Sequence, residues 1–282
     1  MKIVEHVLPS RDVLICPIGD VQFGNSACSL KYVNRYLDWT KQLAFQVGAQ
    51  RRFIGTGDYM DLMSPSNRAG YRASGLYSST LRTLQDLALE PVAQQTYELL
   101  GPHLRGETVA LCQGHHWMYF EGDGMKDGEG KEHFHSDKWL AAMVGAVFVP
   151  AAVLVKFIFP SGRIYRILAT HGQGNAQTLS YATNKLDKQS SAWEAIDAFA
   201  SGHTHKAGIV ASTRIREEDG KLVSRQVPLM ACGGFLKAYL VDEVNYPEEF
   251  QLAPLALSAT ALRLTEVDES NEGLLIQPIM LM

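Results

Sequence analysis

The sequence predicts a single α/β domain, and three observations support this prediction. The chain has 282 residues, of which 46% are hydrophobic and 20% charged, so it can bury a full core. Short apolar runs alternate with segments of helical periodicity, which is typical of βαβ units with parallel strands. No internal repeat or low-complexity linker divides the sequence. We therefore expect one domain over residues 1–282.

Charge and cysteine usage narrow the setting in which the protein works. The formal net charge is −4 and the pI is near 6.1, so nothing draws the whole chain towards nucleic acid or an anionic membrane. The four cysteines are scattered and form no CxxC pair. They favour reduced thiols in the cytoplasm over a disulfide framework.

No membrane span or export signal is expected from the sequence. The first residues lack a signal-peptide pattern. The longest apolar run, residues 139–158, is interrupted by Gly145, Pro150 and Lys156, which favours a helix and strands there. We expect a cytoplasmic protein without membrane contact.

The first half of the chain contains three predicted strands that end in acidic or imidazole side chains. These strands are Val13–Ile18, Arg52–Gly55 and Thr108–Cys112. A helix is predicted over Ser29–Val47, and helical sequence runs from about Ser78 to Leu100. The strands are followed by Asp20 with Gln22, by Asp58 with Asp61, and by His115 with His116. Because ligands gather at the carboxyl ends of strands in open α/β sheets, we expect these side chains to lie together.

Two loops are predicted from composition. Residues 62–72 read as a polar loop, in which Arg68 and Arg72 are candidate phosphate contacts or solvated side chains. Residues 121–132, rich in Gly, Asp and Lys, read as a flexible loop.

The second half continues the pattern of elements that end in histidine. Ser136 is expected to cap a short helix over Asp137–Val144. A predicted hairpin of Ala152–Phe159 and Ile164–Ala169 leads to His171, and helical sequence from Gln177 to Ala198 leads to His203 and His205. Further strands are predicted at Ile209–Ile215, Leu222–Met230, Tyr239–Val241, Ala259–Val267 and Gly273–Met280.

The side chains at these segment ends suit a divalent-metal centre. Five of the nine histidines lie in three turns, each directly after an apolar run. Oxygen and imidazole ligands together suit manganese, iron or zinc better than magnesium or calcium, and the absence of thiolates argues against a structural zinc site. Asp58 has two carboxylate oxygens and could bridge two cations.

The order of these motifs resembles that of the calcineurin-like metallophosphoesterases. The family pattern is D-x-H, GD-x-x-D, GNH-[DE], a lone His and GH-x-H, and the resemblance runs from about Val13 to His205. Spacing and loops look most like the phage-type, DNA-exonuclease-like branch. The resemblance implies a four-layer β-sandwich flanked by α-helices, with a dimetal site at strand ends. It also implies a helical insert at about residues 62–100 and C-terminal strands at about 206–282.

The resemblance also implies roles for individual residues. It assigns Asp20, Asp58 and His205 to the first metal, with Asp58 shared, and His171 and His203 to the second. His116 matches the histidine that protonates the leaving oxygen or steadies the phosphate, and Asp61 matches the acid that orients it.

Two positions depart from the family pattern. Gln22 stands where the family has a histidine, and its neutral amide oxygen is a weaker donor, so the first metal is expected to be held less tightly or to rely on water. His115 stands where the family has an asparagine, and it is still expected to bind the second metal.

We therefore expect a metal-dependent phosphoesterase that uses two divalent ions. Manganese is favoured, and iron, zinc, nickel and magnesium are alternatives. A phosphodiesterase or nuclease acting on single-stranded nucleic acid or a nucleotide is the leading hypothesis. A phosphomonoesterase acting on a nucleotide or phosphoprotein is the second. A non-catalytic binding or scaffold protein, which Gln22 keeps open, is the third.

Several other residues have competing readings. Trp117, Tyr119 and Phe120 are expected to pack beneath their loop, with stacking on a base as the alternative. His133 and His135 are expected to be mobile surface residues, with a lid over the site as the alternative. Cys112 is read as a small buried hydrophobe, and His6 and His103 as surface residues.

Overall fold

The computed structural model describes residues 1–120, 124–174, 178–218, 220–237, 257–267 and 274–281. Within these ranges the side chains of residues 66, 71–73 and 218 are outside the description. The strand predicted at Tyr239–Val241 also lies outside the described residues.

Two sheets, joined through one long strand, form the centre of the molecule. The first sheet contains β1 (Lys2–Val7), β8 (Ala152–Ile158), β9 (Ile164–Thr170), β10 (Ala198–Ser201), β11 (Ala207–Glu218) and β12 (Lys221–Gly234). The second contains β2 (Asp12–Gly19), β3 (Gln50–Gly57), β4 (Thr108–Cys112), β7 (Val147–Val149), β13 (Ser258–Glu266) and β14 (Leu274–Leu281). Strand β12 pairs with β11 along most of its length, with β10 over Leu229–Ala231, and with β13 at Gly233 and Gly234.

Strand direction determines where the turns that carry the predicted ligands lie in each sheet. Strands β2, β3, β4 and β7 are parallel neighbours. Strands β9 and β10 are also parallel, while β8 and β9 form the predicted antiparallel hairpin. The carboxyl ends of β2, β3 and β4 therefore share one edge, and those of β9 and β10 share another.

Apolar side chains from both sheets form the inner core. Fully buried residues include Ile15 and Ile54 from one sheet and Val155, Phe157 and Ile167 from the other. These residues alternate along their strands with others that face outwards, as a two-sheet sandwich requires.

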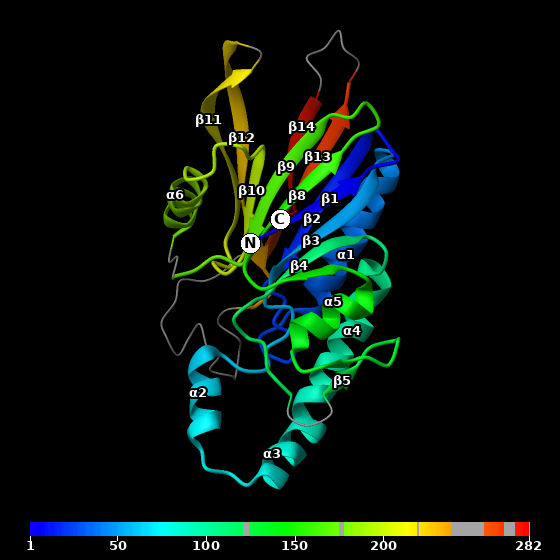
Figure 1. The fold of residues 1–282 in the computed structure, drawn as a ribbon, viewed down its shortest axis with the longest axis vertical. Coiled ribbons are helices and arrows are strands. Elements are labelled where there is room, and N and C mark those ends of the chain that lie inside the picture. Colours follow the sequence, from blue (N-terminus) through cyan, green and yellow to red (C-terminus); the bar gives the residue numbers. More distant parts are fainter. Residues whose placement is uncertain (121–123, 175–177, 219, 238–256, 268–273, 282) are drawn as a thin grey trace.

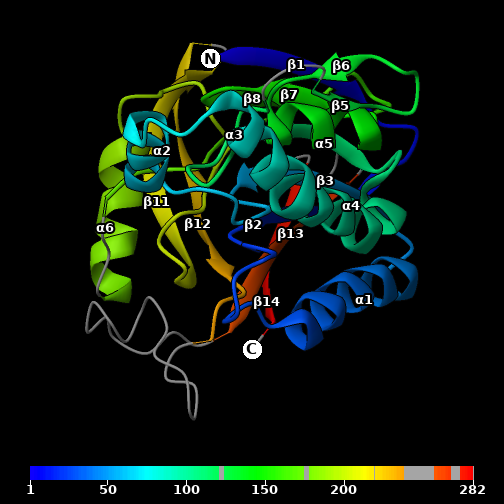
Figure 2. The same cartoon turned by 90° about the horizontal axis from the view of Figure 1, so that it is seen from below.

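Helices cover both outer faces of the sandwich. Helices α1 (Leu30–Gln46), α4 (Glu90–Leu104) and α5 (Ser136–Val144) pack on the second sheet, and α6 (Leu179–Ser190) packs on the first. Figure 2 shows α6 on one side and α1, α4 and α5 on the other. In α1 the buried side chains recur every three or four residues from Tyr32 to Ala44, so one stripe faces the sheet. The predicted four-layer α/β class is confirmed.

The polar segment at residues 62–72 was wrongly predicted as a loop, because helix α2 spans Pro65–Ala73. Pro65 occupies the first turn, where a missing N–H costs nothing, and the Ser64 hydroxyl accepts from the Asn67 N–H at 3.2 Å. The Ser-Pro pair is therefore a helix start. The insert continues through α3 (Ser78–Leu84), a π-helical turn η1 (Gln85–Leu89) and α4. Figure 1 shows α2 and α3 beyond the ends of the sheets.

Other boundaries also need correction. Helix α6 ends at Ser190 rather than near Ala198, since the side chain of Arg214 donates to the Trp193 carbonyl and the Ser190 hydroxyl and holds a turn there. Ser136 is the first helical residue of α5, and its hydroxyl accepts from the Met118 N–H instead of capping. Strand β1 was not predicted.

The predicted flexible loop at residues 121–132 holds local order over residues 124–132, while residues 121–123 lie outside the described part of the chain. A small hairpin of β5 (Met125–Lys126) and β6 (Glu132–His133) is formed there, and the intervening turn is closed by the Asp127 carboxylate, which accepts from the Glu129 and Lys131 N–H groups.

The four histidines expected on the surface are more constrained than predicted. His133 and His135 are 8% and 5% exposed. His133 pairs with Asp127 at 2.9 Å, and His135 stacks on Trp117. His6 is half-buried and accepts from the Arg52 side chain at 2.8 Å, while His103 is half-buried at the end of α4. Arg52 lies 46 residues from His6, so no local pattern marks that contact, whereas Asp127 lies only six residues from His133 in the same loop.

Cysteine and membrane expectations can be compared with the structure. All four cysteines are free, and Cys112 is buried as predicted. Among the described residues, none of the helices combines the length and apolar character needed to cross a bilayer.

Candidate metal centre

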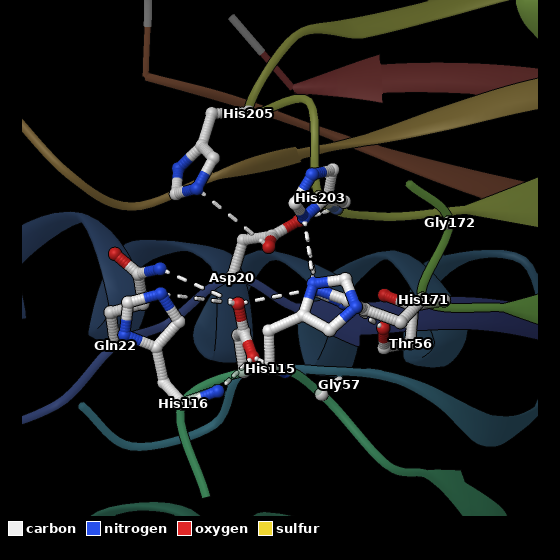
Figure 3. A network of polar contacts seen from close by, with 12 residues as sticks. Asp20, Gln22, Thr56, Gly57, His115, His116, His171, Gly172, His203 and His205 are labelled. Atoms are coloured by element: carbon white, nitrogen blue, oxygen red, sulfur yellow. Dashed lines mark hydrogen bonds and ion pairs between the residues drawn. The ribbon is translucent and has the colours of Figure 1, made fainter. Parts of the chain in front are cut away.

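Five segment ends from distant parts of the sequence converge at one place. Strands β2, β3 and β4 deliver Asp20 with Gln22, Asp58 with Asp61, and His115 with His116. Strands β9 and β10 deliver His171 and then His203 with His205. Figure 3 shows the side chains of Asp20, His115, His171, His203 and His205 directed towards a common centre. The structure brings all seven predicted metal ligands together.

The Asp58 carboxylate lies at the middle of this cluster and is 3% exposed. Its Oδ1 accepts from the backbone N–H groups of His115 and His116, the latter at 3.0 Å. Its Oδ2 lies 3.2 Å from His171 Nε2 and 3.5 Å from Gln22 Nε2. The first oxygen fixes the turn after β4, so the second is presented to the cluster.

Three imidazoles meet on one side of Asp58. His203 Nδ1 lies 3.2 Å from His115 Nδ1 and 3.2 Å from His171 Nε2. The other nitrogen of His171, Nδ1, donates to the Thr56 carbonyl at 2.7 Å, which fixes the ring and leaves Nε2 facing His203 and Asp58. The three facing nitrogens form a group that could hold a metal ion.

A second group of potential ligands consists of Asp20, Asp58 and His171. Asp20 is fully buried, and its Oδ2 accepts from the His203 N–H at 2.6 Å. Its Oδ1 has no hydrogen-bond partner among the described residues and lies 3.8 Å from His205 Nε2. A buried carboxylate oxygen without a donor is costly, and a cation would satisfy it.

The backbone is strained at these same residues. Among the described residues, five that are not glycine have φ in the left-handed region. They are Asp20, Gln22, Asp58, His203 and His205. Each conformation costs about 1 kcal/mol or more, and such strain clusters where function requires it. All five belong to the predicted ligand set.

Glycines allow the turns to approach each other closely. A Cβ on Gly114 would lie 2.1 Å from Asp58 Oδ1, and a Cβ on Gly57 would lie 2.7 Å from His171 Nδ1. Gly57 also has φ of +97°, which disfavours any side chain. The Gly-Asp and Gly-His pairs are therefore required by space as well as by turn geometry.

Burial and neighbouring charge shift the pKa values of Asp20 and Asp58 in opposite directions. Burial raises the pKa of Asp20 to about 7, although the charge of His171 opposes this. Burial by itself would also raise the pKa of Asp58, but the charge and hydrogen bond of His171 outweigh burial and hold that pKa below its usual value. Burial lowers the pKa of His203 to about 3, which leaves its imidazole neutral and able to act as a ligand.

His116 and Asp61 form a separate pair at the edge of the centre. His116 Nδ1 lies 2.6 Å from Asp61 Oδ1, and Asp61 Oδ2 accepts from the Asn25 side chain at 2.7 Å. His116 Nε2 faces the centre, 3.9 Å from Asp58 Oδ2. The geometry gives His116 a fixed orientation and leaves Nε2 directed at the centre of the cluster.

The sequence matches no protein-family model and no curated protein. Similar solved structures include a conserved uncharacterized protein of Streptococcus pneumoniae, described as a predicted phosphoesterase. It is 10% identical, with a TM-score of 0.34, and the match covers 96% of this chain and 98% of that one. Chaetomium thermophilum Vps29 is similar to the same degree. Its complex with a cyclic peptide is 12% identical over 96% and 97% of the two chains, and Vps29 alone is 10% identical over 96% and 98%, both with a TM-score of 0.34. Similarity of this degree does not identify an activity, so the site must be judged by its own geometry.

The residues present fit divalent metal ions. The orphaned Asp20 oxygen, the converging imidazole nitrogens and the absence of an arginine or lysine bonded to Asp20 or Asp58 in the described contacts leave a cation as the missing partner. Carboxylate and imidazole together suit transition ions.

Arg68 lies near the site but is occupied by the protein itself. Its Nη1 donates to the carbonyls of Met63, His115 and Trp117 at 2.6–2.7 Å, and its guanidinium lies 4.1 Å from the Trp117 ring centre. Arg68 therefore holds the turn that carries His115 and His116. Its contact with substrate stays a prediction, and the Arg72 side chain lies outside the described residues.

The aromatic residues beyond His116 mainly pack, as expected. Trp117 lies between Arg68 and His135, with its ring stacked on His135 at 4.4 Å between ring centres. Phe120 is buried at 2% exposure, whereas Tyr119 is 47% exposed. Of the three, Tyr119 retains the most surface for contact with a substrate.

Three supporting residues were not found from the sequence. Thr56 orients His171 through its carbonyl, Asn25 holds Asp61, and buried Asp137 accepts from the Gly114 N–H at 3.0 Å. Asn25 lies in the same turn as Asp20 and Gln22, which was a usable signal. Backbone carbonyls and a helix-start aspartate leave no comparable pattern.

Proposed function

We propose that the chain is a metal-dependent phosphoesterase of the calcineurin-like type, and that its substrate is a phosphodiester. The observation that carries the proposal is the convergence of predicted ligands from five segments around Asp20 Oδ1, an atom without a hydrogen-bond partner among the described residues. The motif order of the sequence supports the same reading. We also propose that the chain belongs to the phage-type, DNA-exonuclease-like branch of this family.

Specific residues would hold the two ions. His115, His171 and His203 present three nitrogens on one side, and Asp20 with His205 presents donors on the other. Asp58 lies between them, and Gln22 lies beside it. When bound, two divalent cations neutralise the oxygens of a phosphate ester and acidify a water for in-line attack.

The chain's own residues supply proton transfer and orientation. His116 is fixed by Asp61, so its Nε2 can give a proton to the leaving oxygen. The pKa of His116 would be lowered by burial alone, but the hydrogen bond of Asp61 and the charge of Asp58 raise it above its usual value. A histidine with a raised pKa keeps its proton near neutral pH, which is what a general acid requires.

The substrate class follows from leaving-group chemistry. A positioned acid is most useful when the leaving group is a poor one such as a sugar hydroxyl. This favours alkyl phosphate esters over aryl ones, and the resemblance to the phage-type branch favours phosphodiesters among them. The acidic net charge favours short, single-stranded or nucleotide substrates over long duplexes. We further propose manganese as a working ion and the cytoplasm as the location.

A metal-replete activity screen tests this function. Purified protein is stripped of metal, reloaded with Mn²⁺, and assayed on single-stranded DNA, RNA, cyclic dinucleotides and phosphomonoesters. We expect manganese-dependent cleavage of a phosphodiester that stops on adding a chelator. Faster cleavage of monoesters would favour the phosphomonoesterase. Absence of both metal uptake and turnover would contradict the proposal and favour a scaffold.

A further inference from the structure

The three imidazoles are arranged as a nearly complete metal position. Tetrahedral coordination at Zn–N distances of 2.0–2.1 Å requires ligand nitrogens about 3.3 Å apart. The two contacts of His203 Nδ1, to His115 and His171, both measure 3.2 Å. The rings stand nearly perpendicular to each other, at 76–88°, so their nitrogens and not their faces meet. Figure 3 shows this convergence.

A single proton cannot join all three facing nitrogens. His171 uses Nδ1 to donate to the Thr56 carbonyl, so its neutral form offers a lone pair at Nε2. A proton on His203 Nδ1 can point at one of its two nitrogen neighbours but not at both. One cation accepts all three lone pairs.

The other position is built mainly from oxygen. It comprises the carboxylates of Asp20 and Asp58 with His171, which also belongs to the first group, and His205 Nε2 lies 3.8 Å from Asp20 Oδ1. Gln22 directs its amide nitrogen, not a ligand atom, at Asp58 Oδ2. Turning the amide would offer only a neutral oxygen. This position therefore has fewer imidazole donors of its own than its neighbour.

Ligand type determines which ions each position favours. Imidazole suits zinc, iron and nickel, whereas carboxylate, amide and water suit magnesium and manganese. A given set of nitrogen and oxygen donors generally binds Zn²⁺ more tightly than Mn²⁺, so the two positions are expected to differ in the ratio of their affinities for these ions.

We propose that the two positions hold unlike ions: a tightly kept borderline ion such as Zn²⁺ or Fe²⁺ at His115, His171 and His203, and an exchangeable Mn²⁺ or Mg²⁺ beside Asp20. The inference rests on the proposed metal centre and specifies its composition. His115 and Gln22, the two departures from the family pattern, produce the inequality.

Metal retention tests this proposal without reference to activity. Metal-free protein is loaded with Zn²⁺, dialysed against a weak chelator, equilibrated with Mn²⁺ and analysed for both metals. We expect one retained zinc and one exchangeable manganese per chain. The His115→Asn variant should retain zinc at least about tenfold less tightly, and Gln22→His should bind the second ion at least about tenfold more tightly. His103→Asn makes the same chemical change away from the site and should behave as the wild type.

Cobalt spectroscopy of the wild-type protein provides a second measurement that needs no variant. The first equivalent of Co²⁺ should give the intense visible bands of a four- or five-coordinate nitrogen-rich site, and the second should give the weak bands of a six-coordinate oxygen-rich one. Two equivalents with identical bands, or two zinc ions lost together, would overturn the proposal.

The two hypotheses fail in different ways. Phosphodiester hydrolysis by a protein with two equal sites would remove the inequality and keep the proposed function. Unequal metal retention without turnover of any phosphate ester would support two unlike metal positions and contradict the proposed phosphoesterase function.

Discussion

The imidazole of His116 is held by Asp61, whose carboxylate oxygen lies 2.6 Å from His116 Nδ1. Asn25 holds the other oxygen of Asp61, so the pair has little freedom to turn. This contact helps keep the His116 pKa above its ordinary value against the opposing effect of burial.

Replacing Asp61 with asparagine should therefore change the pH profile of hydrolysis. Removing the charge lowers the pKa of His116, so the acid form is lost at a lower pH as the pH rises. We expect the alkaline limb of kcat/KM to move to lower pH on a substrate with a poor leaving group. An unchanged alkaline limb in a folded variant would show that Asp61 does not act through His116.

Replacing His116 with asparagine should discriminate between leaving groups. We expect a loss of about 100-fold or more on dialkyl or nucleoside phosphodiesters, because their alkoxides need a proton to depart. Activated aryl esters should lose much less. Equal losses on both substrates, measured side by side, would count against proton donation.

Gly234 lies behind His205, and a side chain there should disturb the carboxylate-rich position. A Cβ on Gly234 would meet His205 Nδ1 at 2.7 Å and Cγ at 3.0 Å. We expect Gly234→Ala to weaken Mn²⁺ binding about tenfold or more while zinc retention by the three imidazoles is kept. Calorimetric titration with each ion measures both effects.

The matched control for this change is Gly128→Ala. A Cβ at Gly128 has no heavy atom within 4 Å, so the variant should bind both ions as the wild type does. Normal Mn²⁺ affinity in Gly234→Ala would show that His205 can move aside or is not a ligand.

Phe157 should be essential to the inner core. Its side chain is fully buried between the two sheets, whereas Phe45 on α1 is 89% exposed. We expect Phe157→Ala to lower the free energy of unfolding by about 3–5 kcal/mol, because it removes apolar contact and leaves a cavity. Phe45→Ala should change it by about 0.5 kcal/mol or less in urea denaturation. Similar small effects for both would contradict the two-sheet core.

Sequence reasoning succeeded where an apolar strand runs directly into a small residue and a polar ligand. The stretch from Ile54 to Asp58 is an example. The strand predicted at Arg52–Gly55 spans Gln50–Gly57 in the structure, so its bounds were nearly right. The periodicity of α1 likewise predicted its buried stripe. In β3 and α1 the local hydrophobic pattern matches the burial of the side chains in the fold, so both elements could be predicted from the sequence.

Elsewhere the deciding contacts are distant in sequence. Strand β1 is half exposed at a sheet edge and pairs with β8 about 150 residues later, so its own pattern is weak. Helix α2 begins with a Ser-Pro pair that serves turns as readily as helices. Gly234 backs His205 from another strand, and no local signal marks that contact.

The most direct test of the central claim compares Asp58→Asn with the wild type in manganese-dependent hydrolysis of bis-p-nitrophenyl phosphate, with folding checked by circular dichroism. Asp58 lies between both groups of ligands, so its loss should remove several kcal/mol of stabilisation from the reaction. We predict a fall in rate of about a thousandfold or more in a folded protein. Wild-type activity in Asp58→Asn would contradict the account.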